Sequence, residues 1–247
     1  MLLLARFMAL GNVKRALLGR YDFEGHYKSF AEISNPTTHD DVAFAGAAVE
    51  ARLRNWPGPY ALDILPIVLA GFRDCTVVDV GGGACTGLSQ IATSLVSPIR
   101  LRYVLVETPA MCKTVRFKLL PHIGIDADCT AIMPKEVKRP CIINVASVLQ
   151  YIDNWRDCLI DFTLLKPEAI IISNTPVWAM QLSFPTYARV QINGKGRRIP
   201  AWCFDRDEIE RNLPGYKLTY YIEERQHLRH KHAPGLSVQA SMIFHPA

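Results

Sequence analysis

The sequence predicts an α/β protein built on a mostly parallel, doubly wound sheet. Three observations predict this fold class. Short, almost unbroken apolar runs, typical of strands buried on both faces, alternate with helical segments. A glycine-rich turn follows the first of these runs, and two strand-like segments end the chain. Together they predict parallel strands covered by helices and closed by a C-terminal antiparallel hairpin, seven strands in all.

The individual elements follow from local patterns. Parallel strands are expected at 75–80, 101–107, 122–127, 141–146 and 169–173, and the hairpin strands at 217–223 and 237–244. Helices are expected at 88–96, from Pro109 onward and at 154–165, with Thr108 and Asp153 as N-caps. Asp205, followed three residues later by Glu208, indicates a capping box. Residues 176–203 lack a regular pattern and are expected to form an irregular binding loop.

Residues 1–72 are expected to form an N-terminal helical extension, and residues 73–247 the domain that contains the sheet. Helices are predicted at 1–20, 40–54 and 61–72. The apolar run in the first is interrupted by Arg6, is too short to span a bilayer and lacks the order of a secretory signal. We expect this helix to pack on the domain, and contact with a membrane surface is the alternative.

The composition excludes several classes of protein. A chain of 247 residues with 49% hydrophobic and 21% charged residues is globular and needs no disulfide or metal to fold. Its seven cysteines are scattered without metal-site spacing, which predicts reduced thiols and a cytoplasmic location. The net charge of +5 comes without a dense basic stripe, so no nucleic-acid partner is expected. The sequence leaves the oligomeric state open.

The segment Val77-Val-Asp-Val-Gly-Gly-Gly-Ala-Cys85 carries the strongest functional signal. Gly81 and Gly83 let the backbone approach a ligand at a helix N-terminus, as in Rossmann-like folds. Asp79 is placed to orient this loop or the ligand, and Glu107, which ends the next strand, to accept hydrogen bonds from ribose hydroxyls. A dinucleotide fingerprint would need glycine at Thr86, so a ligand without a pyrophosphate is favoured, and S-adenosylmethionine is such a ligand.

Further cofactor contacts are expected around this loop. Gly82 and Thr108 adjoin the residues just named. Asp128, after the weak third strand, is a candidate partner for the adenine amino group or a solvated loop acid. Ser147, after the fourth strand, is expected to face the methyl sulfonium, and its alternative role is that of a turn residue.

From about Phe23 onward the chain resembles the bacterial methyltransferases that are often encoded beside surface-polysaccharide biosynthesis genes. The matching pieces are Phe23-Glu-Gly-His-Tyr-Lys-Ser-Phe30, Asp79-Val-Gly-Gly-Gly83, Val106-Glu-Thr-Pro109, Ala146-Ser-Val-Leu-Gln-Tyr151, Asn174-Thr-Pro176, Val190-Gln191 and Pro200-Ala-Trp202. The resemblance implies a class I methyltransferase fold, S-adenosylmethionine as cofactor and a small-molecule or glycan-type acceptor.

The chain departs from this family's pattern at two positions. Cys85 stands where the loop usually continues with glycine, and its side chain is expected to crowd the methionine end of the cofactor. Asn174 stands where an arginine is common, which implies a different acceptor or a loss of activity.

The acceptor is expected to lie between residues 176–203 and a basic, histidine-rich turn at 225–232. The candidate acceptor-binding residues are Gln150, Tyr151, Arg197, Arg198 and Trp202. Aromatic rings beside arginines suit a sugar or an anionic acceptor, whereas the competing interpretation assigns the rings to the core and the cations to solvent. His227, His230 and His232 fit no zinc-site spacing, so no metal is expected. For a general base, His26, Asp153 and the C-terminal histidines are equivalent candidates.

The sequence thus predicts an S-adenosylmethionine-dependent methyltransferase that acts on a small-molecule or glycan-type acceptor, at oxygen. Two alternatives stay open. A non-catalytic scaffold of the same fold would account for Cys85 and Asn174, and a nucleotide-dependent oxidoreductase is disfavoured by Thr86.

Overall fold

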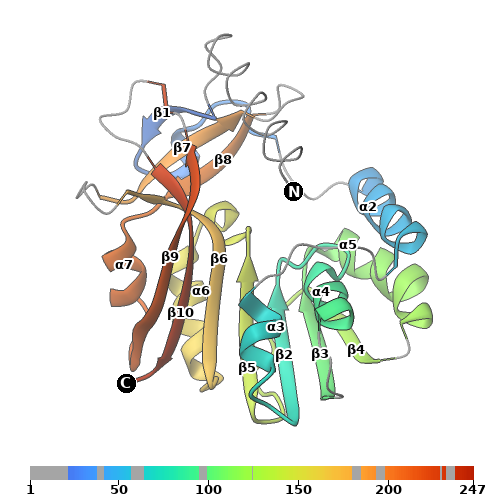
Figure 1. Cartoon of the computed structure of the whole chain (residues 1–247). Helices are drawn as coiled ribbons and strands as arrows, with labels where there is room; N and C mark the ends of the chain where they lie inside the picture. The colour runs from blue at the N-terminus through green and yellow to red at the C-terminus, as the bar shows by residue number, and fades with distance from the viewer. Residues whose placement is uncertain are drawn as a thin grey trace, which may run out of the picture.

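The computed structural model describes residues 22–37, 42–56, 64–94, 99–123, 125–179, 185–192, 198–228, 230–231 and 237–247. Its main sheet has seven strands in the order β4-β3-β2-β5-β6-β10-β9 (Figure 1). In that order the strands are Asp126–Thr130, Arg100–Val106, Asp74–Val80, Cys141–Ala146, Ala169–Trp178, Ser237–Pro246 and Tyr216–Leu228. β4, β3, β2, β5 and β6 are parallel, whereas β10 runs antiparallel to both β6 and β9. The predicted mostly parallel sheet with its C-terminal antiparallel hairpin is confirmed.

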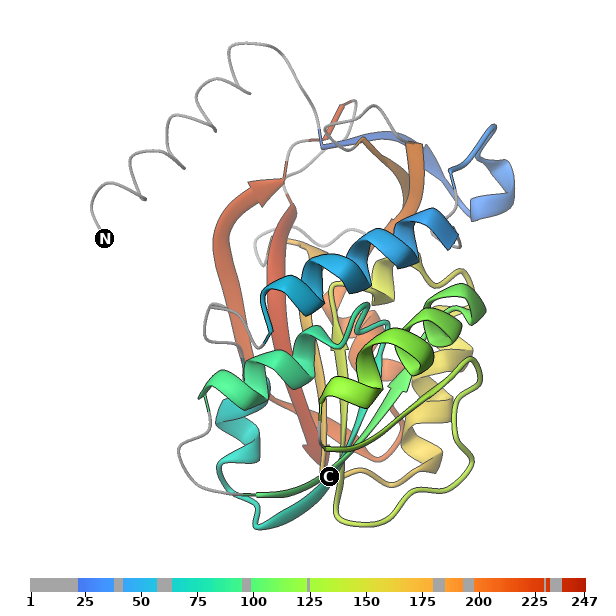
Figure 2. The ribbon, with the colours of Figure 1, turned by 90° about the vertical axis from the view of Figure 1, so that its right-hand side faces the viewer.

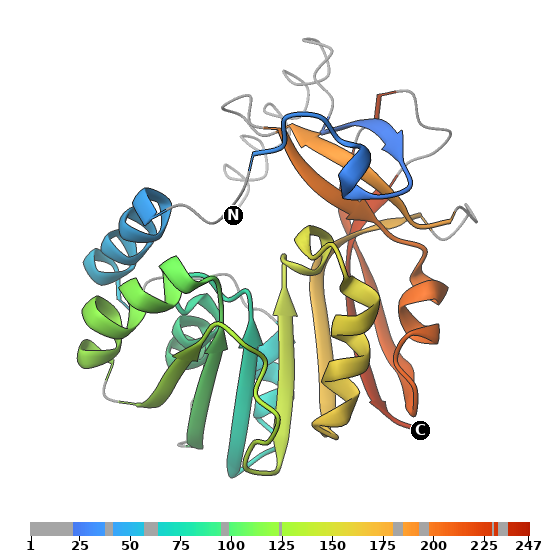
Figure 3. The ribbon, with the colours of Figure 1, turned by 180° about the vertical axis from the view of Figure 1, so that it is seen from behind.

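Helices cover both faces of this sheet, which explains the continuous apolar strands. In β2, Val77 packs into the core on the face covered by α2 (Val42–Arg54), α3 (Ile64–Leu69), α4 (Thr86–Ser94) and α5 (Pro109–Thr114). The next residue, Val78, packs into the core on the opposite face, against α6 (Trp155–Leu164) and α7 (Arg206–Arg211). Figures 1 and 3 show these two helical layers on either side of the strands. Short helical turns lie at Phe30–Glu32 (η1), Val115–Leu119 (η2), Leu120–His122 (η3) and Leu149–Tyr151 (η4).

A second, three-stranded antiparallel sheet sits beyond the carboxyl ends of the main strands (Figure 3). It consists of β1 (Phe23–Tyr27), β7 (Tyr187–Ile192) and β8 (Arg198–Cys203) in the order β1-β7-β8. The end of β6 contacts this sheet next to β8, because the Trp178 N–H donates to the carbonyl of Phe204, the residue after β8, at 3.0 Å. Figure 2 shows α2 below this small sheet and beside α4 and α5.

The small sheet corrects two predictions. Residues 176–203 are not an irregular loop, because the end of β6 and all of β7 and β8 fall within them. The segment 1–72 is not purely helical, because β1 pairs with β7, with Phe23 opposite Gln191. Proline is disfavoured in strands, so Pro200 kept the sequence pattern from indicating β8. It is tolerated there because β8 is an edge strand of its sheet.

Several element boundaries also differ from the prediction. The third parallel strand, β4, begins at Asp126 and not near 122. Asn154, not Asp153, is the N-cap of α6, and its side chain makes no capping hydrogen bond. Asp205 does cap α7, since its carboxylate accepts the Asp207 N–H at 3.1 Å. The capping box is not closed, because the Asp205 N–H donates to the Thr186 hydroxyl.

Two expectations concern parts of the chain that the structure describes only partly. The predicted helix at 1–20 lies outside the described residues. Among the helices that are described, none is long and apolar enough to cross a membrane. The described side chains include no group of three or more His, Cys, Asp or Glu residues that would hold a metal ion.

Candidate functional site

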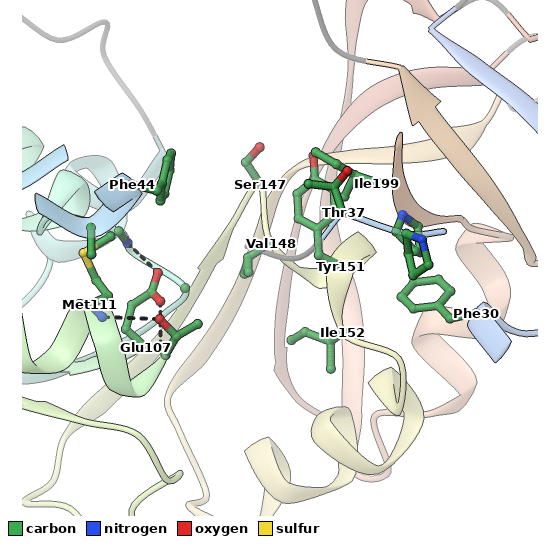
Figure 4. Close-up of a pocket in the computed structure, with 16 residues that line it drawn as sticks. Phe30, Thr37, Phe44, Glu107, Met111, Ser147, Val148, Tyr151, Ile152 and Ile199 are labelled. Atoms are coloured by element: carbon green, nitrogen blue, oxygen red, sulfur yellow. Dashed lines mark hydrogen bonds between the residues drawn. The ribbon is translucent and has the colours of Figure 1, made fainter. Parts of the chain in front are cut away.

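A cavity of about 620 Å³ opens at the carboxyl ends of the parallel strands (Figure 4). This is the edge where ligands of open α/β sheets bind. One wall, called here the loop wall, comes from α2, the glycine loop and α5 and consists of Phe44, Ala45, Gly81, Gly83, Glu107, Thr108 and Met111. The other, the apolar wall, consists of Phe30, Pro36, Thr37, Tyr151, Ile152, Ile199 and Pro200. Ser147 and Val148 lie between the two walls.

The glycine loop needs glycine for close packing as well as for its backbone conformation. Gly81 has φ +66°, and a Cβ there would lie 2.2 Å from a methyl carbon of Val148. A Cβ at Gly82 would lie 2.1 Å from a carboxylate oxygen of Asp79. Side chains at these positions would therefore displace the loop from its support, which accounts for the sequence signal.

Asp79 supports the loop from below and does not reach the cavity. Its side chain is fully buried. One carboxylate oxygen accepts a hydrogen bond from the Asn144 amide at 2.7 Å, and the other accepts one from the Tyr103 hydroxyl. Burial and the Asp79 charge raise the pKa of Tyr103 well above its usual value, so the phenol stays a donor. The predicted role in orienting the loop fits this geometry, whereas direct contact with a ligand does not.

Arg52 fastens α2 to the glycine loop, and sequence reasoning missed it. Its guanidinium is buried and donates to the Ala84 carbonyl at 3.0 Å, the Thr86 hydroxyl at 2.9 Å and the Ser89 hydroxyl at 3.3 Å. Burial lowers the pKa of this group. A cation beside the N-terminus of α4 opposes the helix dipole, so these bonds must outweigh an unfavourable placement. No motif predicts it, because a single arginine on a helix has no sequence signature.

Glu107 both supports the glycine loop and lines the cavity. Its Oε1 accepts the Gly83 N–H at 3.0 Å and its Oε2 accepts the Thr108 N–H at 2.7 Å, as the dashed lines in Figure 4 mark. A carboxylate accepts about four hydrogen bonds, so a side chain of this kind can hold backbone donors and ligand hydroxyls at the same time. Thr108 also caps α5, with its hydroxyl accepting the Met111 N–H at 3.4 Å. Both residues line the cavity.

Ser147 stands at the centre of the cavity in a strained conformation. Its φ of +59° lies in the left-handed region, directly after β5. Its N–H donates to the Ser173 carbonyl at 2.8 Å, which fixes the strained turn. Residues held in this region outside glycine concentrate at functional sites. Figure 4 shows the side chain between the loop wall and the apolar wall.

The structure brings Tyr151 to the cavity but not Gln150. Tyr151 lies in the apolar wall, and its hydroxyl donates to the Gln191 side chain at 2.5 Å. Burial raises its pKa, so the ring carries no charge near neutrality. Gln150 is only 3% exposed and is not among the residues that line the cavity, which does not favour its assignment to the acceptor.

Two of the remaining predicted acceptor residues have other partners in the structure, and the third lies outside the described residues. Trp202 belongs to the core, where its indole N–H donates to the Ile152 carbonyl at 3.1 Å and its ring stacks on Phe30. Arg198 forms an ion pair with Glu24 across the small sheet. Arg197 lies outside the described residues.

In the described part of the histidine-rich turn, His230 does not supply the expected cation. His230 stacks on Phe23, and its Nε2 pairs with the Ser237 hydroxyl. Burial and the nearby Arg189 charge lower the pKa of His230 to about 3, so its ring is neutral. β9 extends through Leu228, so much of the expected turn is strand. His232 and Arg229 lie outside the described residues.

Asp128 and Cys85 also differ from expectation. Asp128 lies inside β4, 62% of its side chain is exposed, and it pairs with Arg116 at 3.5 Å; it does not line the cavity. The sequence misplaces it because β4 starts later than predicted.

Cys85 is fully buried in the core and does not line the cavity either, so it does not crowd a ligand. Its φ of +58° instead explains why glycine is the usual residue there.

The comparisons with known proteins concern the fold. No family model matches the sequence, and no curated protein matches it. A solved structure of a LepI variant in complex with S-adenosylhomocysteine and a substrate analogue superposes with a TM-score of 0.50 at 15% identity, covering 85% of this chain and 56% of that chain. The chain has the class I methyltransferase fold.

Two further solved structures are similar at lower scores. A Burkholderia thailandensis 1,6-didemethyltoxoflavin-N1-methyltransferase with bound S-adenosylhomocysteine has a TM-score of 0.46 at 15% identity, over 87% of this chain and 93% of that chain. The neocarzinostatin O-methyltransferase NcsB1 has a TM-score of 0.47 at 12% identity, over 83% and 57%.

Proposed function

We propose that the chain binds S-adenosylmethionine against the loop wall and methylates a small-molecule acceptor, at oxygen, on the apolar wall. One observation carries this proposal: a single cavity joins the glycine loop and Glu107 to a separate apolar wall, with Ser147 between them. A cavity with two chemically different walls suits two ligands that must meet end to end.

The loop wall fits the proposed cofactor on its own chemistry. Glu107 lines the cavity with a carboxylate, a group that accepts hydrogen bonds from ribose hydroxyls, and Phe44 and Met111 offer apolar surface to a base. When bound, S-adenosylmethionine supplies an electrophilic methyl group on a sulfonium. The chain's own contribution is alignment of the two ligands and exclusion of water, which is the principal catalytic effect available for an in-line displacement.

The two sequence departures that favour a non-catalytic scaffold both lie away from the cavity lining. Cys85 is buried in the core, and Asn174 adopts φ +50° within β6, a conformation that asparagine tolerates better than arginine does. Backbone conformation therefore accounts for the residues at these two positions, and neither residue is a reason to exclude catalysis. The glycan-type acceptor implied by the sequence resemblance stays the alternative to a small molecule.

Calorimetric titration of the full chain with S-adenosylmethionine, S-adenosylhomocysteine and NAD tests the cofactor. We expect the first two to bind and NAD not to bind. Glu107→Ala should weaken S-adenosylhomocysteine binding by about 1–3 kcal/mol, because the ligand hydroxyls lose their hydrogen-bond partner. Glu168→Ala is the matched control, since Glu168 pairs with Arg139 at the far end of the sheet. Equal affinities for Glu107→Ala and the control would remove Glu107 from the site, and binding of NAD alone would refute the proposal.

A further inference from the structure

The apolar wall carries no charge in the part of the chain that the structure describes. Of the described residues that line the whole cavity, Glu107 alone is charged, and it belongs to the loop wall. An ionised acceptor buried against the apolar wall would lose its hydration without gaining a counterion, which is strongly unfavourable. The described part of the wall therefore favours an uncharged ligand over a carboxylate or a phosphate.

The described basic groups of the small sheet and of the histidine-rich turn do not line the cavity. Arg198 pairs with Glu24, and His230 is held neutral. Arg189 is fully buried within the small sheet and donates to the Lys231 carbonyl at 3.0 Å, while its Nε and Nη1 have no partner among the described residues. None of these three groups lines the apolar wall, where it could pair directly with a charged acceptor.

The shape of the apolar wall favours a flat ring. Phe30 is held by stacking on the Trp202 ring at 5.0 Å, and Trp202 is itself fixed by its bond to the Ile152 carbonyl. Ile199 and Pro200 add rigid aliphatic surface from β8. Figure 4 shows Phe30, Ile152 and Ile199 on the same side of the cavity, across from Glu107. Rigid apolar and aromatic surfaces of this kind bind ring systems with little loss of side-chain freedom.

The polar side chains of the apolar wall are neutral hydroxyls. Thr37 and Tyr151 supply two of them, and Ser147 adds a third at the centre of the cavity. Of the expected general bases, His26, Asp153 and the described C-terminal histidine His230 do not line the cavity. An aliphatic alcohol, about as weakly acidic as water with its pKa of 15.7, needs such a base, whereas a phenol of pKa about 10 gives up its proton far more readily.

We propose that the acceptor is an uncharged aromatic hydroxyl compound, a phenol, whose ring lies on the apolar wall and whose oxygen lies beside Ser147. The inference rests on the proposed function and names its acceptor class. In the reaction the phenol oxygen forms a bond to the methyl carbon while the carbon–sulfur bond breaks. The electron pair of that broken bond goes to sulfur, and the phenol proton is released to solvent.

The test uses the full chain saturated with S-adenosylhomocysteine and three probes: 4-phenylphenol, biphenyl-4-carboxylate and methyl glucoside. We expect the phenol to bind at least tenfold more tightly than the carboxylate and the glucoside. With S-adenosylmethionine in place of the product, mass spectrometry should detect 4-methoxybiphenyl. Phenol binding no tighter than that of either other probe, absence of phenol binding, or methylation of the glucoside in preference would overturn the inference.

A pair of variants separates this inference from the cofactor assignment. Phe30→Ala should weaken phenol binding about tenfold and leave S-adenosylhomocysteine affinity within twofold. Phe117→Ala is the matched control, because Phe117 is 75% exposed and does not line the cavity. If the unsubstituted chain does not bind S-adenosylhomocysteine, the proposed function itself is refuted. Retained cofactor binding with equal phenol affinity in Phe30→Ala and Phe117→Ala would refute only the acceptor class.

Discussion

Replacement of Cys85 tests whether backbone strain, and not contact with a ligand, governs this position. Cys85 is fully buried with φ +58°. A non-glycine residue in the left-handed region costs about 1–2 kcal/mol, and glycine avoids this cost. Glycine loses about 0.5–1 kcal/mol more in conformational entropy on folding. The comparison of Cys85→Gly with Cys85→Ala isolates these terms, because both variants remove the same thiol.

The balance favours glycine by up to about 1.5 kcal/mol, which reverses the usual order of the two residues. For a chain of this size each 1 kcal/mol of that difference corresponds to about 2–4 °C in melting temperature. Urea unfolding and thermal melts of the two variants measure it, with the wild type as reference. Cys85→Ala as stable as Cys85→Gly, or more stable, would refute the strain argument. S-adenosylhomocysteine affinity should stay within twofold in both variants, because Cys85 does not line the cavity.

Two further predictions concern buried basic groups. Arg52→Met should lower the free energy of unfolding by about 1–3 kcal/mol and weaken S-adenosylhomocysteine binding, because the Ala84 carbonyl loses its partner at the loop. Arg54→Met, on the exposed side of the same helix, is the control in urea unfolding. Equal losses of unfolding free energy in the two variants would contradict the role of Arg52 in holding α2 to the glycine loop. The pKa of His230 is lowered to about 3 in the folded chain. Between pH 6.5 and 3 this histidine is therefore protonated in the unfolded chain and neutral in the folded chain. Stability should fall by up to about 1.4 kcal/mol per pH unit between pH 6.5 and 3, and His230→Gln should reduce this slope. An unchanged slope would contradict this role of His230.

The parts of the fold that local sequence predicts are those whose environment is locally determined. β5 is predicted at its observed bounds, Cys141–Ala146, because a strand buried on both faces is apolar throughout. The glycine loop and Glu107 are recognisable because each follows the end of such a strand. Thr108 is recognisable as an N-cap from the proline beside it.

The parts that the sequence does not predict depend on contacts between distant segments. β1 and β7 pair residues as far apart as Phe23 and Gln191, and neither strand is apolar enough to be recognised alone. Arg198 resembles a free cation until the fold brings Glu24 to it. The same holds for Trp202, whose ring looks available for stacking in the sequence and is core in the structure. Sequence reasoning therefore locates the loop wall and misjudges the chemistry of the apolar wall.

A crystal structure of the full chain grown with S-adenosylhomocysteine tests the central claim most directly. We expect the ribose hydroxyls to lie within hydrogen-bond distance of the Glu107 carboxylate. We also expect the sulfur near Ser147, with the space beside Phe30 and Ile199 left open for the acceptor. Ligand density that fills the apolar wall instead, or a ribose that does not contact Glu107, would contradict the proposed arrangement.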